Sequence, residues 1–233
     1  MRPIRSRLDP AGKKVSGMLV AAGIFLICCA GLLAAYNACD DYRAGLVSAQ
    51  ALSGIRQAQA LPEDAGETKQ VEQGEHSTDG KSGGEREYRT PLYVLYPDLM
   101  MPTVKIDGTD YIGTLEIPSL ELDLPVISEW SYPGLRKAPA RYGGSAYRDD
   151  LVIAAHNYER HFGRLAGLKP GDELSFTDMD GNRFHYYVLG TEYLDGTDVS
   201  GMEDGNWDLS LFTCTKGGRL RLTVRCMRDR TRQ

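Results

Sequence analysis

The stretch Leu211–Cys226, LFTCTKGGRLRLTVRC, decides how the C-terminal part of the chain folds. It reads as two short strands joined by a Gly-Gly turn, because apolar and polar residues alternate on both sides of the turn. If Cys214 lies opposite Arg221, the two share one face of the hairpin, since side chains alternate between the faces of a strand. The other face is then uniformly apolar: Leu209, Leu211, Leu222, Val224 and Cys226.

The same register keeps the two C-terminal cysteines apart. Cys226 falls opposite Leu209, which places its sulfur on the order of 16 Å along the ladder from Cys214, at about 3.3 Å per residue. A disulfide requires Cα atoms within roughly 7 Å. Two cysteines in an oxidising compartment would otherwise suggest a bridge. We therefore predict that Cys226 is a core residue and that Cys214 is a free thiol.

The N-terminal part is apolar and has charge on both flanks. Residues 15–38 carry no charge, which is enough to span a bilayer core of about 30 Å as a helix. Basic residues precede this run, whereas Asp40 and Asp41 follow it. The positive-inside bias puts residues 1–14 in the cytoplasm and the rest outside the cell. An uncleaved anchor over residues 15–38 is predicted because the run exceeds the apolar region of a signal peptide, and a cleaved signal peptide is the alternative.

Residues 39–90 have a different composition, rich in Gly, Gln, Glu, Ser and Lys. Such a segment buries too little apolar surface to offset its ordering entropy, so it is predicted to be a solvated extracellular tether. Continuation of the membrane helix through residues 42–61 is the alternative for its first part. On this interpretation, residues 1 to about 90 serve location and are dispensable for folding.

Residues 91–233 are predicted to form one mainly β domain, a closed β-barrel of seven to eight strands with short helices. The whole chain is mildly acidic, with net charge -5, and offers no basic patch for nucleic acid. The expected elements are strands within 111–127 broken at Pro118 and Pro125, a buried strand at 150–156, a short helix at 162–168, a hairpin at 173–194 turned at 179–182, and the terminal hairpin.

Three side chains suggest chemistry by their positions. Cys214 ends one strand of the terminal hairpin, and a reactive thiol needs a neighbour that favours the thiolate or manages its proton. Arg221 supplies permanent positive charge one cross-strand step away. His156 stands where the apolar strand LVIAA stops, at a rim where rigid strands commonly deliver functional side chains.

These segments resemble the sortases, membrane-anchored cysteine transpeptidases of Gram-positive bacteria. SLFTC followed by Arg221 is similar to the family's T-L-x-T-C and downstream arginine. IGTLEIPSLELDLPVI resembles the first barrel strands, and LVIAAHNYERHFGRLAGLKPGD resembles the segment with the catalytic histidine. The resemblance covers about residues 111–228. It departs at Ser210, where the family has threonine, a change expected to affect only packing.

The resemblance implies that Cys214 is the nucleophile, His156 the acid or base and Arg221 the third catalytic residue. It implies cleavage of an LPxTG-like sorting signal through a thioester, and transfer of the acyl part to an amine of peptidoglycan or of a pilin. Surface proteins with such signals would be the partners, and the enzyme would sit in the cell membrane with its catalytic domain outside. A membrane-anchored cysteine hydrolase with the same residues and a non-catalytic scaffold barrel are the alternatives.

Thr213 and an acidic loop are also assigned roles. The resemblance gives Thr213 a role near the oxyanion, with a locally satisfied strand threonine as the alternative. Some sortases bind calcium through oxygen ligands at a barrel loop. The candidate calcium ligands lie in an acidic loop: Asp195, Asp198, Glu203 and Asp204. Simple solvation of this loop is the alternative. No other cofactor is expected.

Overall fold

The computed structural model describes residues 10–60, 90–203 and 206–232. By their contacts, residues 1–43 and residues 44–233 form two separate compact units. The first unit contains the start of helix α1 (Pro10–Ala60), and the second contains its end together with the β domain.

The first unit is an apolar helix. From Gly17 onward, α1 is the one helix among the described residues that is long and apolar enough to cross a membrane. Its large apolar side chains are exposed, including Leu26, Ile27 and Leu32. A soluble helix normally buries such a surface, whereas a lipid bilayer would cover it. This helix is consistent with the predicted anchor over residues 15–38.

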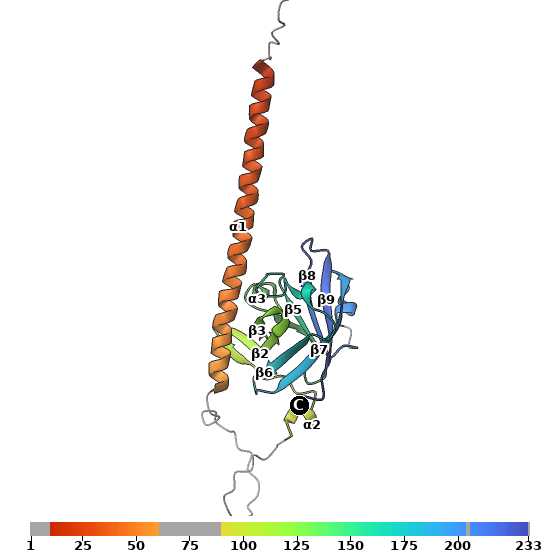
Figure 1. The fold of residues 1–233 in the computed structure, drawn as a ribbon. Coiled ribbons are helices and arrows are strands. Elements are labelled where there is room, and N and C mark those ends of the chain that lie inside the picture. Colours follow the sequence, from red (N-terminus) through yellow and green to blue (C-terminus); the bar gives the residue numbers. More distant parts are fainter. Residues whose placement is uncertain (1–9, 61–89, 204–205, 233) are drawn as a thin grey trace, which may run out of the picture. The chain divides into compact units, whose positions relative to one another are not determined.

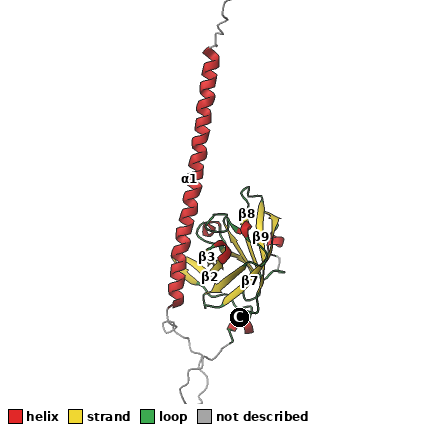
Figure 2. Ribbon diagram, viewed as in Figure 1, coloured by secondary structure: helices red, strands yellow, loops and turns green. Residues whose placement is uncertain are grey.

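The second unit is a closed β-barrel, as the sequence predicts (Figures 1 and 2). Among the described residues, eight strands follow one another in the order β2-β3-β4-β5-β8-β9-β7-β6, and pairing of β6 with β2 closes the ring. A short strand β1 pairs antiparallel with the first residues of β2. The strands are β1 (Val104–Ile106), β2 (Thr109–Ile117), β3 (Leu122–Ile127), β4 (Ala140–Gly143), β5 (Leu151–Ala155), β6 (Glu173–Asp178), β7 (Arg183–Asp195), β8 (Leu209–Cys214) and β9 (Leu220–Arg228).

Helical structure in the barrel domain is limited to short pieces between strands (Figure 2). The predicted helix at 162–168 is shorter than expected, a single 3-10 turn, although Phe162, Leu165 and Leu168 are all buried. The short elements are α2 (Leu92–Leu95), η2 (Pro118–Leu120), α3 (Tyr132–Leu135), η3 (Leu165–Gly167) and α4 (Val199–Met202).

The predicted break at Pro125 is wrong, because Pro125 lies inside β3 and pairs with Thr114 of β2. The other neighbour, β4, pairs with β3 only at Ile127. The strand therefore has an open edge at Pro125, where a missing N–H costs no ladder hydrogen bond. The break at Pro118 is confirmed, since η2 begins there.

The register of the terminal hairpin is confirmed residue by residue. Cys214 pairs with Arg221, and Leu209 pairs with Cys226. Cys226 is fully buried in the main core, as expected for the apolar face. Burial raises the pKa of its thiol well above the ordinary value, so this sulfur stays protonated.

Helix α1 continues to Ala60, in agreement with the alternative for residues 42–61, and its end packs on the barrel domain rather than forming a solvated tether over residues 44–60. Ile55 is fully buried and Ala51 nearly so, in a cluster that includes Tyr111 of β2. Gly54 lets the helix approach closely, because a Cβ there would lie 3.0 Å from the Ile106 side chain. The sequence expectation failed because the few apolar residues of this stretch fall on one helix face. The rest of the predicted tether, 61–89, lies outside the described residues.

This packing predicts that the tether region contributes to stability. A chain that begins at residue 90 should melt several degrees below one that begins at residue 44, because it exposes the surface that the helix covers. In the longer chain, Ile55→Ala should cost about 2 kcal/mol, or roughly 5 °C in Tm. Thermal unfolding by circular dichroism measures both effects, with Val47→Ala as an exposed control. Equal melting of the two chains would show that the helix is dispensable for folding.

Candidate active site

The strand register brings the three candidate residues to one rim of the barrel. β5 and β8 are parallel, with Ala155 paired to Thr213, so the next residues along both strands are His156 and Cys214. Neighbouring strands lie about 4.8 Å apart. On the other side of β8, Cys214 pairs with Arg221 of β9. Imidazole, thiol and guanidinium therefore come from three adjacent strands.

All three side chains line one cavity of about 180 Å³. Cys214 is half-buried, so its sulfur is accessible without being fully solvated. The other residues that line this cavity are mainly apolar, and the sequence alone did not identify them. The one signal available was strand alternation, which places Phe212 on the same face of the strand as Cys214. These other lining residues are Trp130, Tyr132, Leu135, Tyr142, Ala154, Ala155, Gly196, Val199, Met202 and Phe212.

Backbone carbonyls and a glycine position Arg221. Its Nη1 donates to the carbonyl oxygen of Gly218 at 2.9 Å. Gly196 follows the end of β7, and Arg219 and Arg221 approach its backbone closely. A side chain there would clash, because a Cβ would lie 3.1 Å from Arg221 Nη1 and 2.9 Å from the Arg219 carbonyl oxygen. The Arg221 guanidinium therefore packs against the backbone of Gly196 and also lines the cavity.

The loop after His156 is held by packed rings. The rings of His156 and Tyr158 lie 5.0 Å apart, and those of Tyr158 and His161 lie 5.6 Å apart. His161 is fully buried. Its Nε2 lies 3.1 Å from the hydroxyl of Ser48, which itself donates to the Lys137 carbonyl oxygen at 2.8 Å. The hydroxyl has one proton, so Nε2 is the donor to Ser48.

Two residues of β8 make side-chain hydrogen bonds that bear on the sequence analysis. The Thr213 hydroxyl donates to the Ala155 carbonyl oxygen at 2.9 Å, and so ties β8 to β5 directly beside His156 and Cys214. The change from the family's threonine to Ser210 is expected to affect only packing, because both residues carry a hydroxyl. The fully buried Ser210 hydroxyl accepts a hydrogen bond from Arg225 Nη1 at 2.7 Å.

A second cavity of about 280 Å³ lies on another side of Cys214, which lines it together with Thr213. Glu159 and Lys216 bring charge to this cavity, and it includes neither His156 nor Arg221. The thiol therefore stands between an apolar cavity and one with charged groups.

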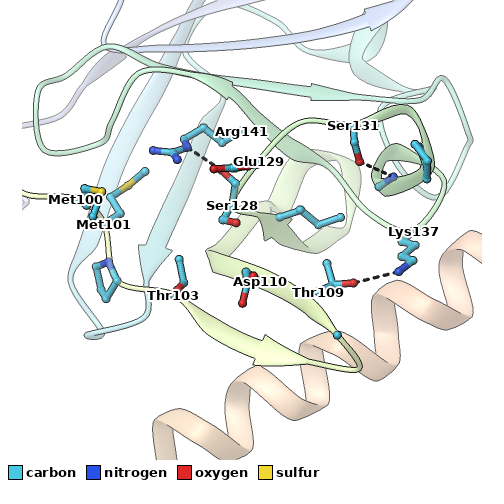
Figure 3. Close-up of a pocket in the computed structure, with 15 residues that line it drawn as sticks. Met100, Met101, Thr103, Thr109, Asp110, Ser128, Glu129, Ser131, Lys137 and Arg141 are labelled. Carbon is cyan, nitrogen blue, oxygen red and sulfur yellow. Dashed lines mark hydrogen bonds between the residues drawn. The ribbon is translucent and has the colours of Figure 1, made fainter.

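Another cavity, of about 740 Å³, is lined by none of the three candidate residues (Figure 3). Glu129 and Ser131 line it, whereas the alternate residues Trp130 and Tyr132 line the cavity with the thiol. The loop that carries them is fixed by its own contacts, with Arg141 Nε donating to the Ser128 carbonyl oxygen at 2.8 Å (Figure 3). Trp130 and Tyr132 of this loop thereby line the cavity that contains Cys214.

The acidic loop shows no metal-binding arrangement within the described part of the chain, where no group of three potential ligands gathers. Asp195 accepts hydrogen bonds from the hydroxyl and N–H of Thr197, which hold the pKa of its carboxyl below the usual value. Asp198 accepts from the N–H of Gly201 and caps α4. Glu203 lies near Gly143. Asp204 lies outside the described residues.

The fold and the rim site define a mixed eight-stranded β-barrel with an accessible thiol at its edge. The sortase domain family matches residues 115–229, and the chain belongs to the sortase family, whose members are cysteine transpeptidases.

Individual relatives are distant. The chain is 28% identical over 125 residues to sortase A of Bacillus anthracis, covering 51% of this chain and 59% of that protein. It is 29% identical over 107 residues to sortase D of Bacillus subtilis, covering 44% and 53%. The match thus spans little more than half the length of these curated relatives.

Solved structures with similarity to the chain include sortase C-3 of Streptococcus pneumoniae, at 29% identity and TM-score 0.46, covering 54% of this chain and 65% of that one. Sortase A of Corynebacterium diphtheriae has 24% identity and TM-score 0.46, with 52% of this chain and 61% of that one covered.

The burial of the two C-terminal thiols predicts selective labelling. In a chain that begins at residue 44, iodoacetamide should modify Cys214 in the folded state and Cys226 only after unfolding. Peptide mapping by mass spectrometry gives the site, with Cys214→Ala as the control that loses folded-state labelling. Recovery of a linked Cys214–Cys226 peptide without reduction would contradict the register, and an inert Cys214 would favour the scaffold interpretation.

Proposed function

We propose that the chain is a sortase that cleaves an LPxTG-like sorting signal through a thioester on Cys214 and transfers the acyl part to an amine of peptidoglycan or of a pilin. The observation that carries this proposal is the position of Cys214, which lines an apolar cavity together with His156 and Arg221. The N-terminal apolar helix supports a role at the cell membrane, with the barrel on the outer side.

The residues supply each step of the acyl transfer. As the Cys214 thiol gives its proton to His156, the sulfur attacks the threonyl carbonyl carbon and forms a tetrahedral oxyanion, which Arg221 stabilises by charge and hydrogen bonds. The C–N bond then breaks, and His156 gives a proton to the departing glycine amine. In the second half, His156 takes a proton from the incoming amine, whose nitrogen attacks the thioester and releases the thiolate. Thr213 acts as a positioning residue, because its hydroxyl fixes β8 against β5 beside the reacting groups.

The two cavities suggest separate places for the two substrates. The apolar cavity suits the leucine and proline side chains of a sorting signal. The cavity with Glu159 opens on another side of the same sulfur and offers a carboxylate to an incoming ammonium. Lys216 lines the same cavity, so the group that can hold an incoming amine there is the Glu159 carboxylate.

Arg221→Lys tests whether the guanidinium serves the transition state. Lysine keeps the charge but loses the planar fork that can hold two oxygens, so kcat/KM should fall by roughly 10² while Tm stays within a few degrees of the parent. Steady-state cleavage of an LPxTG-like peptide with triglycine as acceptor measures the loss. Cys214→Ala should abolish both thioester and product, and His156→Ala should be nearly as severe. A lysine variant with parental activity would assign Arg221 a structural role.

Glu159→Gln tests the acceptor side separately. An exposed carboxylate contributes less than about 1 kcal/mol to holding an ammonium, so KM for triglycine should rise two- to fivefold. The rate of thioester formation from the sorting peptide should not change, because that step precedes amine binding. Product ratios by chromatography, with Glu173→Gln as a control on β6, measure transfer against hydrolysis. An unchanged KM for triglycine would remove Glu159 from the acceptor site.

A further inference from the structure

The strand face that carries Cys214 and Arg221 also carries a second cross-strand pair, Ser210 and Arg225, at the other end of the hairpin. Arg225 of β9 lies opposite Ser210 of β8. Because every second residue of a strand points to the same side, Ser210 shares its face with Phe212 and Cys214, and Arg225 shares its face with Arg221. Phe212 lines the active-site cavity between the two ends.

Arg225 is a buried cation whose acceptors lie on several elements. Its side chain is 6% exposed. Nε donates to Glu192 of β7 at 2.6 Å, and Nη1 donates to Ser210 at 2.7 Å. The same Nη1 also reaches the Met202 carbonyl oxygen at 3.4 Å, and Nη2 donates to the carbonyl oxygen of Gly201. The guanidinium thereby joins two strands of the barrel to the end of α4.

Only an arginine can make this set of contacts. Burying a charge is costly unless it is paired and hydrogen-bonded, and here the acceptors diverge from one planar group. The ammonium of a lysine is a compact charge that cannot reach the same acceptors together. The ring of Trp207 lies 5.8 Å from the guanidinium carbon and covers it further.

The segment that Arg225 holds is a wall of the active-site cavity. Gly196, Val199 and Met202 all line that cavity, and Met202 packs in the same cluster as Phe212. The helix α4 in this wall is a single turn, which is too short to be stable by its own hydrogen bonds. Its last carbonyls are fixed from outside the segment by Arg225.

We propose that Arg225, held by Ser210 and Glu192, is a specificity-positioning residue: it fixes the Gly196–Met202 wall, so that the apolar cavity keeps the shape that selects the side chain entering it. The inference rests on the proposed function for the peptide substrate. Arg225 does not touch the reacting atoms, so its loss should affect substrate selection more than the chemical step.

The test compares Arg225→Lys, Ser210→Ala and the exposed control Arg230→Lys in the full chain. Two peptides are used, an LPxTG-like signal and the same peptide with alanine in place of its leucine. Arg225→Lys should reduce the preference for leucine at least fivefold, mainly through KM, since apolar pockets discriminate by fit. Ser210→Ala should have the same effect more weakly, and it provides the answer if Arg225→Lys melts far below the parent. Arg230→Lys should match the parent.

Hydrogen exchange of the backbone amides gives a second readout that does not need activity. In both β8–β9 variants, amides of residues 199–203 should exchange at least tenfold faster than in the parent, while those of residues 222–224 stay protected. Unchanged exchange, or faster exchange with unchanged peptide preference, would overturn the inference. If the parent cleaves neither peptide, the proposed function fails and the specificity role fails with it, whereas exchange still decides whether Arg225 fixes the wall.

Discussion

The site depends on the register of three adjacent strands, β5, β8 and β9. Parallel pairing of Ala155 with Thr213 sets His156 beside Cys214, and antiparallel pairing of Cys214 with Arg221 adds the guanidinium. A slip of one residue on any of these strands would turn its candidate side chain to the opposite face. The buried leucine, valine and cysteine side chains on the inner face of the hairpin resist such a slip, because it would expose them. The packing of the core therefore fixes the same strand register that places the three candidate side chains.

Contacts from neighbouring strands and loops hold the residues of the candidate site in place. Thr213 ties β8 to β5, and bare backbone at Gly196 accommodates Arg221. Arg225 holds the segment that closes the cavity, at the far end of the same strand face. The reactive rim can thus stay partly open to substrate, because its rigidity comes from buried contacts behind it. This arrangement is typical of sites built on strand ends with loops fixed by the scaffold.

The end of α1 also contacts the loop that follows His156. Ser48 contacts His161, whose ring packs on Tyr158, and Tyr158 in turn packs on His156. Helix residues near the apolar segment thus contact the loop that follows the candidate acid or base. Residues 44–60 of α1 are part of the folded domain in this sense, and a division of the chain into anchor, tether and enzyme by composition alone misses this.

The sequence by itself determined the apolar helix, the closed barrel, the hairpin register and the identity of Cys214, His156 and Arg221 as candidates. These follow from local alternation, turn residues and hydropathy, which act over a few positions. Tertiary structure alone decided which residues line the cavity, that Ser210 bonds to Arg225, that residues 44–60 pack on the barrel, and that Pro125 sits within a strand. Each of these depends on neighbours far away in the chain, such as the open edge beside β3 or the α4 carbonyls beside β9. No local pattern encodes such neighbours, because they arise only when the barrel closes.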